Sequence, residues 1–169
     1  MHIARTLGVL AVAVLHMSQA PVFSDPVLVT SVAQGDSIQV QTFGAVRLLG
    51  IDAPRAGRGL APGEPFGREA KDRLAGIVGH RWVRLEFAEG PRGERGRHAA
   101  YVILEDGTFV NAVLVREGLA RATARGSSRR AGELRRAEDE ARAARRGLWG
   151  GSAFDRGPMP SVLAPLSSE

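Results

Sequence analysis

Apolar and polar residues alternate along the chain from residue 27 to residue 51, which is typical of β-strands. Three apolar runs occur there, and in the second of them Ile38 and Val40 alternate with glutamines. Glycines and polar residues at 34–36 and 42–45 separate the runs and favour turns. We therefore predict a three-stranded meander over this region.

The apolar residues change to helical spacing after Pro65, which suits the first turn of a helix, and Gly79 suits its end. The apolar face of this predicted helix consists of Phe66, Ala70, Leu74, Ile77 and Val78. Alternation returns at 83–87 and a continuous apolar run follows at 99–104, so two more strands are expected there.

Two further helices are predicted, a short one over 110–117 and a longer one that begins at Ser127 or Ser128 and ends at Gly147. The buried stripe of the longer helix consists of Leu134, Ala137, Ala141 and Ala144. Its charged residues, including the Glu138–Arg142 pair, are interpreted as a solvated outer face.

Five strands, interrupted by a helix after the third and followed by more helices, predict an α+β fold. The architecture expected is a small, partly open five-stranded Greek-key barrel of the OB type with α-helices packed on it. The chain has 169 residues and no cysteine, so we expect one domain, over residues 26–150, that depends on packing and not on disulfides.

Residues 1–24 have the pattern of an export signal: a basic start, an apolar stretch and small residues before Pro21. The apolar stretch is shorter than the roughly 20 residues that a membrane span needs. Proline is a poor residue at a cleavage point, which leaves open a cut elsewhere or a retained signal anchor. We expect a periplasmic or secreted protein, with a disordered tail over 151–169 that is rich in Gly, Pro and Ser.

The formal net charge of +5 favours polyanionic partners such as nucleic acids, acidic glycans or anionic lipids. Lys71 is the only lysine, so nearly all of the positive charge is arginine. Such a bias can also come from genome composition, and charge alone does not choose the partner.

Two aspartates are predicted to meet at one end of a hairpin. If the second and third strands pair about a reversal at Phe43-Gly44, Asp36 lies opposite Ile51 and beside Asp52. In a regular strand, Arg47 would be roughly 16 Å from Asp52 and on the opposite face.

Six motifs occur in order along the chain: GDSIQV (35–40), RLLGIDAP (47–54), PFGREA (65–70), GERGRHAAYV (93–102), DGTFVNAVLVREGLA (106–120) and LW (148–149). Together they resemble the staphylococcal nuclease family of thermonucleases. The resemblance implies an OB-fold barrel with three helices and a calcium-dependent phosphodiesterase that acts on DNA and RNA. We also expect a monomer.

By this resemblance, Asp36 and Asp52 match metal-binding aspartates, and the backbone carbonyl of Ala53 matches a further ligand position. Arg47 and Arg97 match the arginines that hold the scissile phosphate. These residue types suit the chemistry, because calcium takes six to eight oxygen ligands and arginine donates two hydrogen bonds to a phosphate. They would stabilise the charge that builds up in the five-coordinate transition state.

Plainer explanations exist for the same residues. Asp36 and Asp52 belong to a residue type that is common in turns for local hydrogen bonding. Arg97 could be an ordinary loop residue. Tyr101 and Asn111 match structural positions of the family and are expected to serve the fold.

The chain departs from the family at Arg55, where the family has a glutamate that acts as general base or orients the attacking water. Arginine stays protonated and offers no acceptor, and the loss of a general base typically costs about 10² to 10⁴ in rate. Glu64 is a candidate substitute base because a loop carries it, whereas Glu69 is held on a helix. Arg92 and Arg95 are candidate nucleic-acid contacts.

Two functions therefore remain open. The first is a slow, divalent-metal-dependent nuclease. The second is a catalytically inactive module that binds nucleic acid, in which Arg55 pairs with Asp36 and Asp52 in place of a metal. A protein-interaction domain is a third alternative, and the preference for DNA or RNA stays open in all of them.

Overall fold

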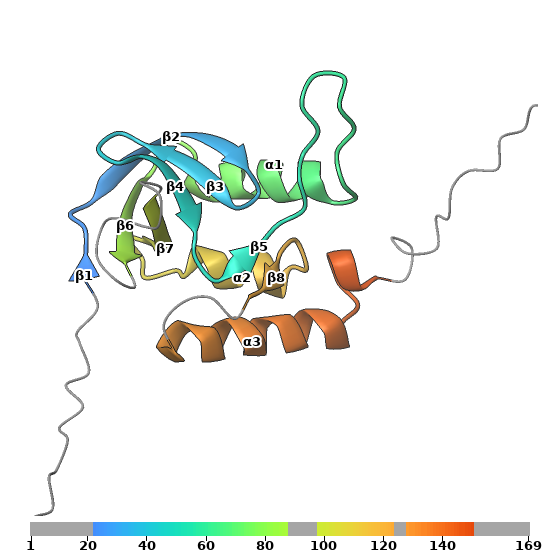
Figure 1. Cartoon of the computed structure of the whole chain (residues 1–169). Coiled ribbons are helices and arrows are strands. Elements are labelled where there is room, and N and C mark those ends of the chain that lie inside the picture. The colour runs from blue at the N-terminus through green and yellow to red at the C-terminus, as the bar shows by residue number, and fades with distance from the viewer. Residues whose placement is uncertain (1–21, 88–97, 124–127, 151–169) are drawn as a thin grey trace, which may run out of the picture.

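The computed structural model describes residues 22–87, 98–123 and 128–150, and these form a closed barrel with helices on one side (Figure 1). Neighbouring strands follow one another around the barrel in the order β2, β3, β4, β7, β6, and β6 pairs with β2 to close it. The strands are β2 (Val27–Gln34), β3 (Ser37–Val40), β4 (Gly44–Leu48), β6 (Trp82–Phe87) and β7 (His98–Leu104).

All barrel pairings are antiparallel except β4 with β7, which is parallel. The short strand β1 (Val22–Phe23) extends the barrel at the edge of β6. A separate two-stranded sheet pairs β5 (Ile51–Asp52) with β8 (Arg121–Ala122). The predicted meander, the five-stranded barrel and the α+β class are confirmed, although the barrel is closed through β6 and β2 instead of partly open.

Three helices pack beside the barrel: α1 (Gly67–Val78), α2 (Val110–Arg116) and α3 (Ser128–Ala143). A 3-10 turn, η2 (Gly147–Trp149), follows α3. The boundaries of the first and last helices differ from the prediction. Helix α1 begins two residues after Pro65, because Phe66 adopts a left-handed backbone conformation with φ of 65°. Helix α3 ends at Ala143, and Ala144 is exposed instead of buried.

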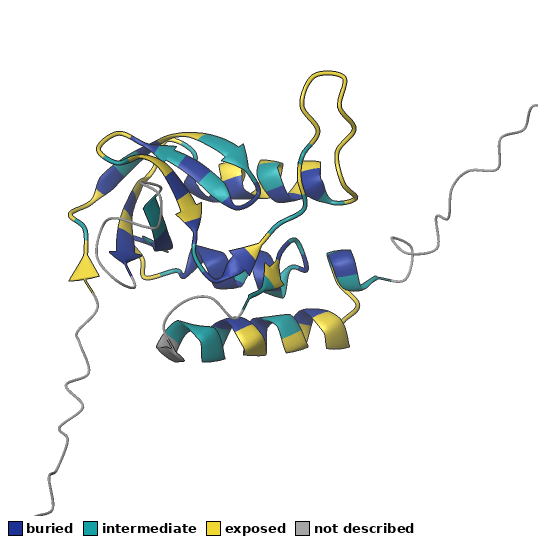
Figure 2. Ribbon diagram, viewed as in Figure 1, coloured by how far each residue is buried: buried dark blue, intermediate teal, exposed yellow. Residues whose placement is uncertain are grey.

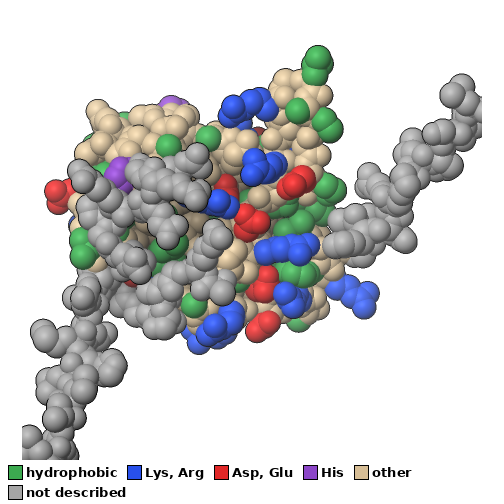
Figure 3. Space-filling model, in the orientation of Figure 1, with side chains coloured by type: hydrophobic (Ala, Val, Ile, Leu, Met, Phe, Trp, Pro, Cys, Tyr) green, Lys and Arg blue, Asp and Glu red, His purple; other side chains and the backbone are tan. Residues whose placement is uncertain are grey.

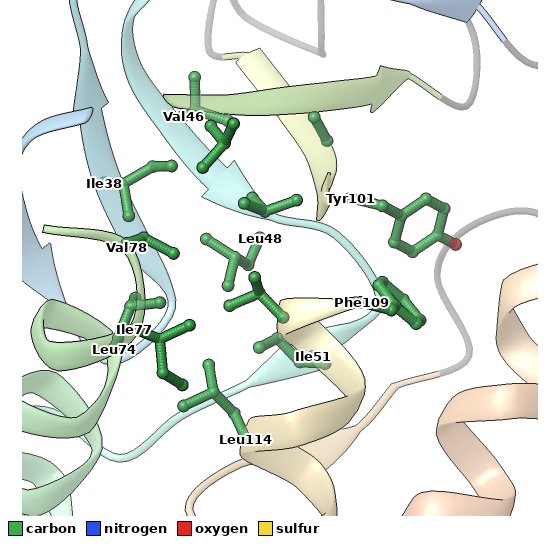
Figure 4. Close-up of a cluster of buried hydrophobic side chains, with 14 of the residues drawn as sticks. Ile38, Val46, Leu48, Ile51, Leu74, Ile77, Val78, Tyr101, Phe109 and Leu114 are labelled. Carbon is green, nitrogen blue, oxygen red and sulfur yellow. The ribbon is translucent and has the colours of Figure 1, made fainter. Parts of the chain in front are cut away.

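The core lies inside the barrel and extends to the helices (Figure 2 and Figure 4). Ile38, Val46 and Leu48 from the barrel strands meet Leu74 of α1 and Leu114 of α2, and each of them is at most 1% exposed. The alternation and the helical spacing of the sequence thus place the predicted apolar faces inward. None of the helices in the described parts of the chain has the length and hydropathy needed to cross a membrane.

Asn111 is fully buried in α2 and joins two neighbouring segments. Its side-chain carbonyl accepts a hydrogen bond from the backbone N–H of Val102 at 3.0 Å, and its amide nitrogen donates to the carbonyl of Leu49 at 2.8 Å. A buried amide is costly unless its polar atoms are paired. Asn111 therefore fixes the end of β4 relative to β7.

The charged side of α3 is not wholly solvated, contrary to the prediction. Glu138 has a side chain that is only 13% exposed, and it accepts a hydrogen bond from the backbone N–H of Ala122 at 3.1 Å while pairing with Arg142 at 3.0 Å. The pair therefore attaches α3 to β8. Periodicity did not reveal this contact because β8 is only two residues long.

Candidate active site

Arg47 joins the two aspartates that the sequence singled out. Its Nη2 atom lies 2.9 Å from Oδ2 of Asp36 and 2.7 Å from Oδ1 of Asp52. The Asp36 side chain is 10% exposed, whereas those of Arg47 and Asp52 are 52% and 63% exposed. Two carboxylates from different segments thus converge on one cation at the rim of the barrel.

The register that brings them together differs from the predicted one. Ser37 pairs with Arg47, and the backbone N–H of Leu48 donates to the carbonyl of Asp36 at 2.8 Å. Asp36 therefore lies opposite Leu48 and not opposite Ile51. The reversal between the strands is centred earlier than Phe43-Gly44, at the turn residues 41–43.

The distance expected between Arg47 and Asp52 was wrong for a related reason. The chain does not continue as one regular strand from β4 to β5, because it turns at 49–50, where Gly50 has φ of 75°. This left-handed conformation is easy for glycine and costly for most other residues. The turn folds Asp52 back to within 2.7 Å of Arg47, where a straight strand would have separated them by roughly 16 Å.

Close packing holds the turn that carries Asp36. A Cβ on Gly35 would lie 2.6 Å from Cβ of Ala70 on α1 and 2.9 Å from Cβ of Ala53, so only glycine fits there. Ser37 donates a hydrogen bond from its hydroxyl to Oδ1 of Asp36 at 2.8 Å. One oxygen of Asp36 is thus held by Ser37, and the other faces Arg47.

The binding-module hypothesis expects Arg55 to pair with Asp36 and Asp52, and the structure does not place it there. Its side chain is exposed, and the ion pairs that Asp36 and Asp52 form within the described ranges are with Arg47. The backbone of Arg55, however, is fixed. Its N–H donates to Oε2 of Glu64 at 2.8 Å, and its carbonyl accepts from the N–H of Glu64 at 2.8 Å. A Cβ on Gly67 would overlap that carbonyl, so the loop packs directly on the start of α1.

The loop between Arg55 and Glu64 is a short hairpin that projects from the body of the molecule, and nearly all of its residues are exposed (Figure 2). Arg58 and Ala61 pair near its tip. At its base, Gln34 accepts a hydrogen bond from the N–H of Ala56 at 2.9 Å. Gln34 therefore attaches the loop to β2.

A hollow of about 440 Å³ lies beside Asp52. It is lined by Asp52, Ala53, Pro54, Glu64, Pro65, Arg121 and Leu148. Three of these residues, Asp52, Ala53 and Glu64, were candidates from the sequence, and the structure brings them to one cavity. Arg121 was not a candidate, and it reaches the site only because β8 pairs with β5.

Arg92, Arg95 and Arg97 lie outside the described residues, and their roles stay predictions. On the face of the molecule in Figure 3, acidic and basic side chains are interspersed between the projecting loop and α3. Within the described ranges, no group of three His, Cys, Asp or Glu side chains could hold a metal ion. A divalent ion at this site would therefore depend on two carboxylates and on oxygen ligands of other kinds.

The barrel with three helices, and the two aspartates and the arginine at its rim, have the architecture of a nuclease-type OB fold. Residues 45–151 match the family model described as staphylococcal nuclease homologue, and the chain belongs to this family. The six motifs along the sequence and the barrel topology lead to the same family.

Several relatives are nucleases. The chain is 37% identical to a thermonuclease of Staphylococcus intermedius over 108 residues, which is 62% of this chain and 64% of that protein. It is 32% identical to a micrococcal nuclease of Shigella flexneri over 154 residues, 85% of this chain and 84% of that protein. It is 32% identical to endonuclease YncB of Bacillus subtilis (strain 168) over 126 residues, 71% and 59% of the two chains. The matches cover less than two thirds of the staphylococcal proteins.

Proposed function

We propose that this protein is a phosphodiesterase that hydrolyses DNA or RNA with the help of a divalent metal ion, and that it is slow because Arg55 replaces the general base. The observation that carries the proposal is the convergence of Asp36 and Asp52 on the Arg47 guanidinium. Family membership and the nuclease relatives support it.

The residues at the rim are of the kind that calcium binds. Asp36 and Asp52 both approach the Nη2 atom of Arg47, so their carboxylates point to a common position, and carboxylate oxygens are ligands that calcium prefers. The carbonyl of Ala53 would add a third ligand. When bound, calcium would polarise a phosphate oxygen and offset the charge of the transition state.

Arg47 would have two roles in this scheme. In the described structure its single positive charge is shared between both aspartates. With calcium between the aspartates, the guanidinium would be released to donate two parallel hydrogen bonds to the scissile phosphate. Arg97 would provide the second arginine.

Glu64 is the best placed carboxylate to take over from the missing base. Its Oε2 lies 2.8 Å from the backbone nitrogen of Arg55, the residue that occupies the base position, and it lines the same hollow as Asp52. We propose that Glu64 orients or deprotonates the attacking water. The alternative is that Glu64 only holds the loop.

A set of four proteins separates these roles: the native chain, Arg55→Glu, Glu64→Gln and the double variant. Cleavage of labelled single-stranded DNA and RNA is measured with calcium and with a chelator. The native chain should cleave slowly and stop when calcium is removed, and Arg55→Glu should be faster by about 10² or more. A native rate that resists chelation would contradict the proposed metal dependence.

The double variant tests Glu64. If Glu64 is the substitute base, Glu64→Gln should slow the native protein at least about tenfold. The same substitution should have little effect in the Arg55→Glu background, since a base is then available at position 55. If Glu64 only holds the loop, both backgrounds should lose activity by the same factor.

The second candidate function is a binding module without catalysis. Two observations favour it: Arg47 already occupies the position between the aspartates, and no third acidic group joins them among the described residues. This module would show no rise in melting temperature with calcium. Its binding to nucleic acid would weaken steeply with salt. A clear stabilisation by calcium would exclude it.

We also propose that residues 1–24 direct export, that 26–150 form the domain and that 151–169 are a disordered tail. Expression of the full chain, followed by cell fractionation and mass spectrometry of the N-terminus, would test export and locate any cleavage. Size-exclusion chromatography with light scattering would test the expectation of a monomer.

A further inference from the structure

Arg121 lies directly opposite Asp52 in the β5–β8 pair, yet it does not form an ion pair with this neighbour. Opposed residues of an antiparallel pair share a face, with Cβ atoms about 4.5–5.5 Å apart. Asp52 instead contacts Arg47 at 2.7 Å. The guanidinium of Arg121 extends over the indole of Trp149, with 5.2 Å between its central carbon and the ring centroid.

Two arginines lie over the ring of Trp149, and among the described residues Arg121 is the one of these two without an ion pair. Arg142 lies over the same ring, at 4.2 Å, but it is paired with Glu138. Glu138 also holds the backbone of β8 through the N–H of Ala122. Among the described residues, no carboxylate lies within ion-pair distance of Arg121. A cation–π contact fixes the direction of a guanidinium without neutralising it.

The hollow that Arg121 lines has both polar and apolar walls. Its volume of about 440 Å³ falls in the range of roughly 300–1,000 Å³ that small ligands occupy. Asp52 connects it to the candidate active site. The apolar lining residues are Ala53, Pro54, Pro65 and Leu148.

From this geometry we infer that the hollow is a subsite for the nucleotide next to the scissile phosphate, with Arg121 holding its phosphate and the apolar walls contacting its nucleoside. The inference rests on the proposed function, because it assumes a nucleic-acid strand at Asp52. It assigns to Arg121 and Trp149 a role in binding the strand and not in the chemical step.

The two carboxylates of the hollow limit where a phosphate can bind. Asp52 shares Arg47 with Asp36, and Glu64 accepts a hydrogen bond from the N–H of Arg55 on the loop side. Arg121 belongs to a different element, β8, and its guanidinium stacks on Trp149 of η2. The phosphate would therefore bind at the Arg121 end, away from Glu64.

Binding without cleavage provides the first test. The affinity of a fluorescently labelled single-stranded oligonucleotide is measured by anisotropy in the presence of a chelator, over a series of salt concentrations. Arg121→Ala should weaken binding about tenfold, the effect of losing a hydrogen bond to a charged group. It should also reduce the slope of log affinity against log salt by about 0.7, the value for one phosphate contact on a single strand.

Arg135→Ala is the matched control, because Arg135 is an exposed arginine of α3 outside the hollow, and its loss changes the net charge equally. It should change affinity by less than about twofold, as expected for a distant, screened charge. Arg121→Lys should recover part of the affinity. Trp149→Leu should weaken binding while the charge is unchanged. Thermal melting of each variant shows that it is folded.

Cleavage of two substrates gives the second test. Arg121→Ala should raise the KM for an oligonucleotide about tenfold and leave kcat unchanged, but it should not affect a minimal substrate with one phosphodiester and no neighbouring phosphate. Equal effects on both substrates would overturn the subsite. The subsite would also be overturned if Arg121→Ala bound the oligonucleotide with the same affinity as the native chain or as Arg135→Ala. Binding that depends on Arg121 without any cleavage would support the subsite and contradict the nuclease.

Discussion

Two arginine–carboxylate clusters of this protein have similar distances and different surroundings. Arg130 of α3 donates to Oε2 of Glu86 in β6 at 3.0 and 2.6 Å, and their side chains are 18% and 3% exposed. Arg47 contacts Asp36 and Asp52 at 2.9 and 2.7 Å, but two of these three side chains are more than half exposed. Distance alone therefore does not separate a structural ion pair from one at a candidate active site.

The difference lies in what happens when a partner is removed. Burial lowers the pKa of Arg130, while the hydrogen bonds and charge of Glu86 raise it, and the net pKa is raised. Arg130 also stacks on Phe109, with 4.6 Å to the ring centroid. Loss of Arg130 would leave a buried charge on Glu86 with less compensation. At the Arg47 site, water or another cation can replace the partner.

The largest stability change is therefore expected at the buried cluster. Arg130→Ala should lower the free energy of unfolding by about 3 kcal/mol, because it removes one partner of a buried pair. Urea denaturation followed by circular dichroism measures the change. The control is Arg136→Ala, an exposed residue of the same helix, which should change the free energy by less than about 0.5 kcal/mol. Similar values for both variants would contradict the comparison.

Arg47→Met should do the reverse, with a small effect on folding and a large one on cleavage. Its pair with the exposed Asp52 should contribute no more than about 1 kcal/mol to stability, and Asp36 keeps the hydrogen bond from Ser37 when Arg47 is lost. Loss of a phosphate-binding cation should lower kcat/KM by about 10²–10³. The rise in melting temperature with calcium should become larger, because Asp36 and Asp52 then lack a competing cation. An unchanged response to calcium would show that Arg47 does not compete for the site.

Asn111→Ala tests the connection between the core and the site. It leaves the buried N–H of Val102 and the carbonyl of Leu49 without this partner, so the free energy of unfolding should fall by about 2 kcal/mol. Because Leu49 precedes the turn that returns Asp52 to Arg47, calcium affinity should fall as well. Denaturation and isothermal titration with calcium measure the two effects. A loss of stability with unchanged calcium affinity would separate the core from the site.

The smallest effect is expected at Asp106, a fully exposed carboxylate. Hydrogen bonds from the side chain and backbone of Thr108 lower the pKa of Asp106, so folding favours its ionised form. This contribution is present above the unfolded pKa, about 3.9, and is lost as pH falls through the lower folded pKa. The urea midpoints of the native chain and Asp106→Asn should differ slightly at neutral pH and converge at strongly acidic pH. A difference that persists in acid would contradict this origin.

The fold was largely predictable because it follows from periodicity. Alternation at residues such as Ile38 and Val40 and helical spacing at Leu74 placed these side chains in the core, where they are at most 3% exposed. Each of these signals is local, and it survives small errors in where a strand or helix begins. The predicted α3 boundary was wrong because the charged and small residues after Ala143 continue a helical pattern without packing on the core.

The site was only partly predictable because it depends on turns and on pairings between distant segments. The aspartates were correctly expected to meet, but by the wrong register. The turn at Gly50 determines the contact between Arg47 and Asp52, and its φ of 75° is not fixed by spacing. Arg121 was missed because two-residue strands such as β8 give no periodic signal.

The loop is held by main-chain atoms of residue 55, so the stability of the fold depends little on which side chain this residue carries. The backbone N–H and carbonyl of Arg55 bind Glu64, and the carbonyl packs against Gly67, while its side chain is exposed. Most residue types could replace Arg55 without disturbing these main-chain contacts. A single substitution at this position would therefore change the rate of the proposed reaction while the free energy of folding stays almost the same. Selection can then favour either a faster or a slower protein through this one residue.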